Sequence, residues 1–431
     1  MACGSFEGPR ALGPTPSATP LKLPQPIAQP ITRTSSAAQT AWLWSSSQSQ
    51  DRARSLIGVN PSGQIVGQLD EAALAGATGV WRSANGATLF IGRESLIAAH
   101  SAVDGKLQRV YKSKPTGSTV ASAVSPDGRW LALLSAGPDP RVQVIDLTAD
   151  VAQALPVVHD PNAKLPGLTG GTAATVWGTV AFGPDSTSLY ALTDWGGPAR
   201  VTAFTLAGDR LAQTGTAVDA QSGRRFPSCA GPAAAASVSA LAKALVIFCH
   251  VDGAIWFFDL NALGNVTVVQ ADQPNPFWLS PIFTPDGQLL YLHQWPGFGD
   301  KMQVVELSSR RMLGPVPTPT KVGDPGPFSW RMPIAYAGGT ASTVPISPDG
   351  LKLYSGTANG VIVLRVPDLK PLAKLAPGLN VNEVWVSGDG RTLYATAENG
   401  KGLFVIREDG SAVIPVSTPT ILGGFISTER G

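Results

Sequence analysis

The chain alternates between short apolar segments and polar turns, and one unit recurs along it. Residues 122–147, 343–369 and 383–408 each contain a short apolar stretch, a tight turn, a second stretch, a connection and a third stretch. Short β-branched and aromatic runs bounded by turn residues predict β-strands. A fourth strand follows, as at residues 370–375 and 411–416. The recurring unit is therefore predicted to be a four-stranded antiparallel sheet.

A Ser-Pro-Asp-Gly turn joins the first two strands of the unit. Pro fixes φ at the second position, Asp hydrogen-bonds the local backbone, and Gly supplies the positive φ that ends the turn. The turn explains each Asp, so these residues do not indicate an acidic site. The copies are Ser125–Gly128, Gly183–Ser186, Thr284–Gly287 and Ser347–Gly350, with degenerate copies at Ser387–Gly390 and Ser83–Gly86.

The number of units predicts a closed ring. Complete units begin near residues 79, 118, 178, 236, 278, 343 and 382, and a partial unit at residues 41–69 lacks its innermost strand. Residues 424–428 offer that strand, and closing the ring with both chain ends removes open sheet edges. We therefore predict an all-β propeller of eight blades over residues 40–431, with seven blades as the alternative. The Pro-, Ser- and Thr-rich residues 1–39 are predicted to be a disordered tether.

The units share a sequence motif that consists of a turn, then Leu-Tyr, then Gly-x-Val-x-Val. An example is Leu353-Tyr354 followed by the stretch from Gly360. The motif resembles the YVTN and amine-dehydrogenase-heavy-chain-like propellers over about residues 40–430, and the turns are similar to those of TolB-type propellers. The resemblance implies the propeller fold. It leaves function open, because these families include partner subunits of enzymes, surface proteins and binding proteins. Consistent Gly-His and Trp-Asp pairs are missing, so the chain is less similar to typical WD-repeat proteins.

Blade topology places the tight turns on one face and the long connections on the other. The long connections are residues 160–177, 219–235, 271–278 and 320–342 between blades, and 194–200 and 294–302 within blades. Exposed aromatic residues beside Arg are typical of recognition surfaces. We therefore predict a ligand or partner surface there; the alternative is that the Trp side chains only cap the blades. Its residues are Trp177, Trp195, Arg224, Arg225, Trp278, Trp295, Asp300, Trp330 and Arg331.

Catalytic motifs are missing from the sequence. The four histidines, His100, His159, His250 and His293, do not show metal-ligand spacing, and we expect no metal and no cofactor. Propeller enzymes gather inward His, Asp or Glu on the innermost strands, whereas residues 120–124 and 179–182 are apolar. The leading hypothesis is a non-catalytic binding or scaffold propeller. The alternative is an enzyme, or the propeller subunit of a dehydrogenase or hydrolase, with its site at the channel mouth.

Charge and the N-terminus bear on partners and location. The net charge is only +2, which does not favour nucleic acid as a partner, and no stretch is typical of a membrane span. Met1-Ala2-Cys3-Gly4-Ser5 resembles the junction at which bacterial lipoproteins are cleaved and acylated on Cys. We expect an extracytoplasmic protein that contacts the membrane only through a lipid on Cys3, or a cytoplasmic one if Met1 is the true start. In an exported protein Cys229 and Cys249 are able to form a disulfide; the alternative is two buried thiols.

Overall fold

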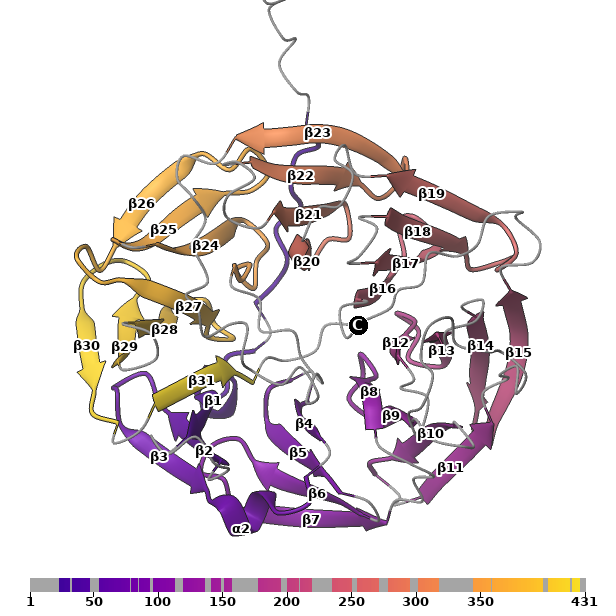
Figure 1. Ribbon diagram of the computed structural model, residues 1–431, viewed down its shortest axis with the longest axis horizontal. Helices are drawn as coiled ribbons and strands as arrows, with labels where there is room; N and C mark the ends of the chain where they lie inside the picture. The colour runs from indigo at the N-terminus through magenta and orange to yellow at the C-terminus, as the bar shows by residue number, and fades with distance from the viewer. Residues whose placement is uncertain are drawn as a thin grey trace, which may run out of the picture.

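Eight β-sheets stand around a ring in the computed structural model, like the blades of a propeller (Figure 1). Each sheet is antiparallel and follows the previous one along the chain. The prediction of eight blades is thereby confirmed. The structure describes residues 23–31, 33–46, 54–77, 79–83, 85–93, 96–112, 119–135, 141–148, 151–156, 177–194, 200–208, 210–218, 235–249, 254–270, 278–294, 301–317, 344–357, 359–397, 402–418 and 421–426.

The blades are numbered from the first strand of the chain. Blade 1 holds β1 (Ala41–Ser46), β2 (Arg54–Val59), β3 (Ile65–Leu69) and β31 (Ile421–Phe425); blade 2 holds β4 (Gly79–Arg82), β5 (Thr88–Gly92), β6 (Leu96–Ser101) and β7 (Leu107–Lys112). Blade 3 holds β8 (Thr119–Val124), β9 (Trp130–Ser135), β10 (Arg141–Asp146) and β11 (Val151–Pro156); blade 4 holds β12 (Trp177–Phe182), β13 (Ser188–Asp194), β14 (Arg200–Ala207) and β15 (Arg210–Val218). Blade 5 holds β16 (Ala235–Ser239), β17 (Ala244–Cys249), β18 (Ala254–Asp259) and β19 (Val266–Gln270); blade 6 holds β20 (Trp278–Phe283), β21 (Leu289–Gln294), β22 (Lys301–Glu306) and β23 (Arg311–Pro317). Blade 7 holds β24 (Lys352–Thr357), β25 (Gly360–Arg365) and β26 (Pro371–Leu375); blade 8 holds β27 (Val381–Val386), β28 (Thr392–Ala397), β29 (Gly402–Arg407) and β30 (Val413–Val416).

Strands from both ends of the chain complete blade 1. β31 is its innermost strand and pairs antiparallel with β1, with Leu43 opposite Phe425. This confirms the predicted closure, with the closing strand three residues earlier than expected. In blade 7 the described residues form three strands, and an isolated bridge between Ile346 and Leu353 marks the innermost position.

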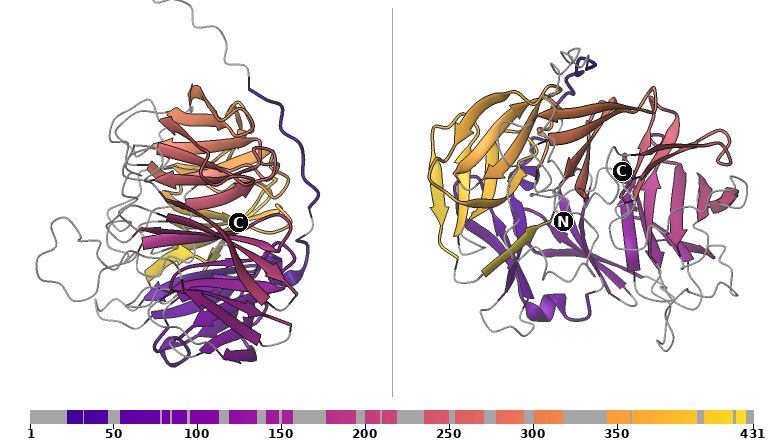
Figure 2. Two further views of the ribbon diagram at one scale, coloured as in Figure 1. Left: turned by 90° about the vertical axis from the view of Figure 1, so that its right-hand side faces the viewer. Right: turned by 45° about the horizontal axis from the view of Figure 1, so that its top comes forward.

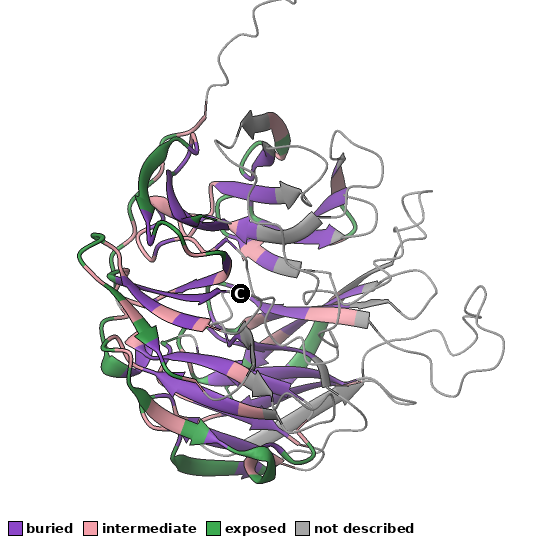
Figure 3. Cartoon of the chain, turned by 60° about the vertical axis from the view of Figure 1, so that its left-hand side comes forward, coloured by how far each residue is buried: buried purple, intermediate pink, exposed green. Residues whose placement is uncertain are grey.

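The core lies between blades rather than in the middle of the ring. Trp130, Ala132 and Leu134 of β9 pack against blade 4, whereas the intervening Leu131 and Leu133 pack against blade 2. Because side chains alternate along a strand, a blade covered on both faces needs apolar residues at nearly every position. The outermost strands β7 and β26 are largely exposed, as the green segments at the rim of the ring show (Figure 3).

The Ser-Pro-Asp-Gly turns have the predicted geometry. In blade 3 the Ser125 hydroxyl donates to the Asp127 carboxylate at 2.5 Å, and the same carboxylate accepts the Arg129 N–H at 3.0 Å. The Trp130 N–H donates to Ser125 Oγ at 2.9 Å, and Gly128 has a φ of +74°. The interpretation of these aspartates as turn residues is thereby confirmed. We call the side of the ring that carries these turns the turn face, and the opposite side the loop face.

An arm precedes blade 1 and lies along the turn face. We call residues 23–31 and 33–40 the arm; they belong to the segment expected to be a tether, whose residues 1–22 lie outside the described residues. Figure 2 shows the arm in indigo along one face of the ring. Near its end lies α1 (Ser36–Gln39), capped by the Ser35 hydroxyl; a second short helix, α2 (Glu71–Leu74), follows β3.

Candidate functional site

The structure places two of the predicted recognition residues at the loop face. Trp177 is the first residue of β12 and lies opposite Asp194, and Trp278 is the first residue of β20 and lies opposite Gln294. Both strands are innermost in their blades, and their other ends lead into Pro-Asp turns. The two backbone positions therefore lie at the inner rim of the loop face.

The other predicted residues cannot be placed. Only the backbone of Trp177, Trp278 and Cys249 is described, so the proposed pairing of Cys249 stays a prediction. The following residues lie outside the described ones: Cys3, Trp195, Arg224, Arg225, Cys229, Trp295, Asp300, Trp330 and Arg331.

Glu383 is a half-buried residue on an innermost strand, with one buried carboxyl oxygen, that the sequence analysis missed. It is the third residue of β27, in the half of that strand away from its turn, and it lies opposite Thr396. Its atom Oε2 is fully buried and has no hydrogen-bond partner among the described residues. Burial raises the pKa of Glu383 to about 7, against the opposing effect of a hydrogen bond from the Phe425 N–H. A carboxyl with such a pKa exchanges its proton near neutral pH.

The surroundings of Glu383 form the seam between blade 8 and blade 1. Phe425, which donates to Glu383, lies on the closing strand β31. Trp385, two residues further along β27, packs with Leu43 and Phe425 across the same seam. The carboxyl therefore links an innermost strand directly to the strand that closes the ring. A sequence signal existed, because Glu383 is a charged residue directly before the apolar run from Val384 to Val386.

Arg82 lies at the turn-face end of the same seam between blades 8 and 1. Its side chain is fully buried and donates to the carbonyls of Ala37, Thr40 and Gly86 at 2.5, 2.8 and 3.1 Å. The guanidinium also lies over the ring of Trp385, 5.1 Å from the centroid. Burial lowers the pKa of Arg82 to about 9, so it is still charged at neutral pH. One residue of blade 2 thus holds the arm and contacts blade 8.

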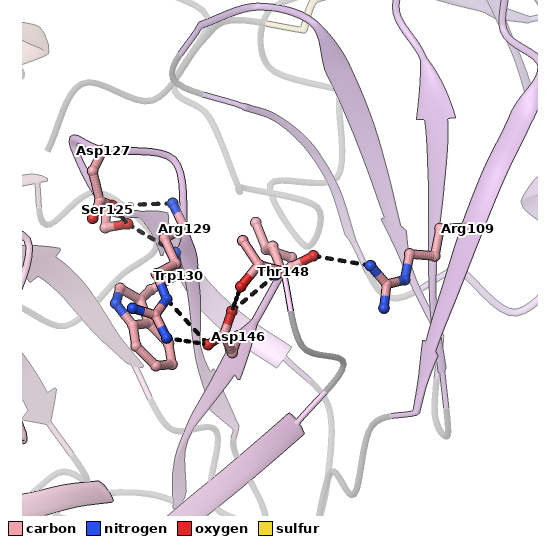
Figure 4. Close-up of polar contacts among 8 residues, drawn as sticks. Arg109, Ser125, Asp127, Arg129, Trp130, Asp146 and Thr148 are labelled. Carbon is pink, nitrogen blue, oxygen red and sulfur yellow. Dashed lines mark hydrogen bonds and ion pairs between the residues drawn. The ribbon is translucent and has the colours of Figure 1, made fainter. Parts of the chain in front are cut away.

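A second polar cluster lies in blade 3 (Figure 4). Arg129 donates through Nε and Nη2 to Asp146 Oδ2, at 3.1 and 2.7 Å, and stacks over Trp130. Burial would raise the pKa of Asp146, but hydrogen bonds from Arg129 and Thr148 outweigh it and lower the pKa to about 2. Arg109 of blade 2 donates to the Leu147 carbonyl at 3.3 Å. Both oxygens of the Asp146 carboxylate accept hydrogen bonds, from Arg129 and Thr148, which indicates a structural role for this cluster.

The described part of the chain contains no group of three or more His, Cys, Asp or Glu side chains able to hold a metal ion. His100, the one described histidine side chain, is buried, and its Nδ1 lies 2.9 Å from the Gly105 carbonyl oxygen. No helix among the described residues is long and apolar enough to span a membrane.

Among known proteins, two solved structures are similar to this chain at low sequence identity. No protein-family model matches the chain, and no curated protein matches it. A solved structure of hydrazine synthase from Kuenenia stuttgartiensis is 18% identical, covering 78% of this chain and 96% of that one, with a TM-score of 0.46. A functionally unknown protein from Desulfotomaculum acetoxidans is 13% identical, covering 90% and 98%, with a TM-score of 0.47. The propeller is shown by its own sheet topology, and the resemblance to YVTN-like propellers stays a prediction.

Proposed function

We propose that this propeller is a non-catalytic binding or scaffold protein that recognises a protein partner or a small ligand on its loop face. The observation that carries the proposal is the asymmetry of the two faces. The turn face consists of short hydrogen-bonded turns and is crossed by the arm, whereas the inner strands β12 and β20 begin at the loop face with the backbone positions of Trp177 and Trp278. Aromatic anchors near the centre of a surface are typical of binding hot spots.

The path of the arm is compatible with a tether that leaves the loop face free. We propose that the protein is extracytoplasmic and tethered through a lipid on Cys3. The arm lies against the turns of blades 6, 7 and 8, so the first described residues of the chain lie on the turn face. A tether on that side leaves the loop face available to a partner.

The test is partner capture by full-length variants. We expect the triple variant Arg224→Glu, Arg225→Glu, Arg331→Glu, and separately Trp177→Ala with Trp278→Ala, to reduce recovery of the captured partner by about tenfold or more, as hot-spot residues do. The matched control is Arg210→Glu with Arg311→Glu, which changes exposed charges on the outermost strands β15 and β23. Quantitative affinity purification after cross-linking measures recovery. Unchanged recovery with the loop-face variants would contradict the proposal.

One observation favours the alternative, an enzyme or the propeller subunit of one. Glu383 has a pKa of about 7 and a buried oxygen without a described partner, properties that general bases and acids share. A screen against hydrolase and dehydrogenase substrates tests this alternative. Turnover that depends on an ionisation near pH 7 and disappears in Glu383→Gln would decide for it.

A further inference from the structure

The first nine described residues of the arm are held on the turn face through their backbone. The Ile27 N–H donates to Asp286 Oδ2 and the Gln29 N–H to the Asp349 carbonyl, both at 2.9 Å. A third hydrogen bond runs from the ring to the arm: Gln288 Nε2 donates to the Gln25 carbonyl at 3.2 Å. The acceptors belong to the Pro-Asp-Gly turns of blades 6 and 7. This segment therefore lies across two neighbouring turns.

The spacing of prolines matches this contact. In an extended chain successive N–H groups point to opposite sides, so Ile27 and Gln29 donate to the turns while positions 26, 28 and 30 point away. Pro24, Pro26 and Pro30 all fall on the side that faces away. Proline lacks an N–H, so these positions leave no unpaired donor in solvent, and its fixed φ favours an extended backbone. The arm thus has the sequence of a preorganised peptide ligand.

Side chains contribute one apolar contact. Leu23 packs against the core between blades 6 and 7, beside Ile282 and Val344. Ile27, by contrast, is 58% exposed and Ile31 is 41% exposed. The contacts of residues 23–31 are therefore shallow, and all three hydrogen bonds are exposed to solvent or nearly so. A segment held in this way is exchangeable.

We propose that the turns of blades 6 and 7 form a second binding site, separate from the loop face, that takes extended proline-spaced peptides. Residues 23–31 occupy it in cis, and a partner peptide of the same chemistry binds when they leave. Its requirements follow from the arm: an apolar residue, a carbonyl two positions later, and N–H donors at the fourth and sixth positions after the apolar residue. Backbone pairing with alternate side-chain pockets is an established way to bind extended peptides.

The experiment releases the arm in the full-length protein and offers the same peptide in trans. Ile27→Pro with Gln29→Pro removes both donors and is the released variant; Ala28→Pro is the matched control, because position 28 points away from the turns. The probe is a fluorescently labelled synthetic peptide of residues 23–31, and its binding is measured by fluorescence anisotropy. We expect the released variant to bind it at least about tenfold more tightly than the wild type or the control, because a cis arm competes at millimolar effective concentration.

The site itself is tested within the released variant. Asp286→Asn replaces the acceptor of the Ile27 N–H while keeping the Oδ1 that holds the turn, and we expect about fivefold or greater weakening of peptide binding. Asp127→Asn, in the equivalent turn of blade 3, is expected to leave peptide binding unchanged.

If the prolines unfold the protein, a protease site placed between residues 31 and 33 and cleaved in the folded protein releases the arm instead. Equal peptide binding by wild type and released protein, no binding by either released form, or no effect of Asp286→Asn would overturn the proposal. Loop-face variants are expected to bind the peptide normally, so this result is independent of the proposed function.

Discussion

Glu383 illustrates what single residues add to a repeat fold. A carboxyl is costly to bury without partners, because desolvation penalises its charged form. At this position one oxygen accepts a backbone N–H of the closing strand and the other has no described partner. The protonated form is therefore favoured in the folded protein, and the seam between blades 8 and 1 is sensitive to pH.

The free energy of unfolding is predicted to fall as this group ionises. Because the pKa is raised in the folded state, the penalty is absent below the unfolded value of 4.5 and grows as the pH rises to about 7. The shift corresponds to about 3 kcal/mol at pH 8. Glu383→Gln should remove this dependence and be more stable than the wild type at pH 8, but not at pH 4. Denaturant unfolding across this pH range measures the difference.

The control for the Glu383 experiment is Glu71→Gln, an exposed substitution in α2. Its free energy of unfolding is expected to stay within about 0.5 kcal/mol of that of the wild type. Equal pH dependence in wild type and Glu383→Gln would show that another group governs the seam.

At the scale of elements, the repeated Leu-Tyr motif links neighbouring parts of the ring. The Tyr291 hydroxyl of blade 6 donates to the Pro367 carbonyl of blade 7 at 2.9 Å, and the Tyr394 hydroxyl of blade 8 donates to the Gln39 carbonyl of the arm at 2.6 Å. Burial raises the pKa of both phenols, so they stay protonated donors. In blades 6 and 8 the tyrosine of the motif therefore joins its blade to the neighbouring blade or to the arm.

The degenerate turn of blade 8 has a related cause. Gly388 stands where the turns of blades 3, 4, 6 and 7 carry Pro. Its N–H donates to the Ala38 carbonyl at 2.9 Å, and a Cβ there would lie 2.6 Å from the Arg33 carbonyl oxygen. Proline at this position would remove the donor and collide with the arm. The glycine therefore makes room for the arm at the turn of blade 8.

Restoring the repeat at this turn is predicted to destabilise the protein. Gly388→Pro should lower the free energy of unfolding by about 2 kcal/mol or more, from the lost hydrogen bond and the steric overlap. Pro348→Gly, in the intact turn of blade 7, is the reverse change and should cost only about 1 kcal/mol or less, through the entropy of the unfolded chain. Thermal and denaturant unfolding compare the two. A neutral Gly388→Pro would mean that the arm does not depend on this contact.

At the scale of the whole molecule, ring closure depends on residues distant in the sequence. β1 and β31 pair across nearly the full length of the chain, and Arg82 holds the arm that leads into β1. A buried guanidinium with three backbone acceptors stabilises the carbonyls that it contacts, and its removal leaves them unsatisfied.

Arg82→Met is predicted to lower the free energy of unfolding by about 3 kcal/mol and to speed hydrogen exchange of the β1 and β31 amides. Arg109→Met, an exposed arginine with one 3.3 Å bond, is the control and should change stability by less than about 0.5 kcal/mol. Loss of stability without faster exchange in β1 and β31 would show that Arg82 supports blade 2 alone.

The sequence by itself predicted the propeller fold and the closure of the ring, and it favoured eight blades over seven, a choice that the sheet topology then confirmed. The fold follows from local physics, since short apolar strands and the Ser125–Gly128 type of turn are encoded within each unit and repeated, and the closure was predicted from the one unit that lacks an innermost strand. The backbone positions of Trp177 and Trp278 at the loop face also follow from topology. Only the tertiary structure decided that the proline-spaced arm binds the turns, and that Glu383 and Arg82 are buried at the seam. Those contacts join residues that are distant in the sequence, such as Thr40 and Arg82, 42 positions apart, and Ile27 and Asp286, 259 positions apart. No local pattern specifies which distant group a buried charge or an exposed turn meets.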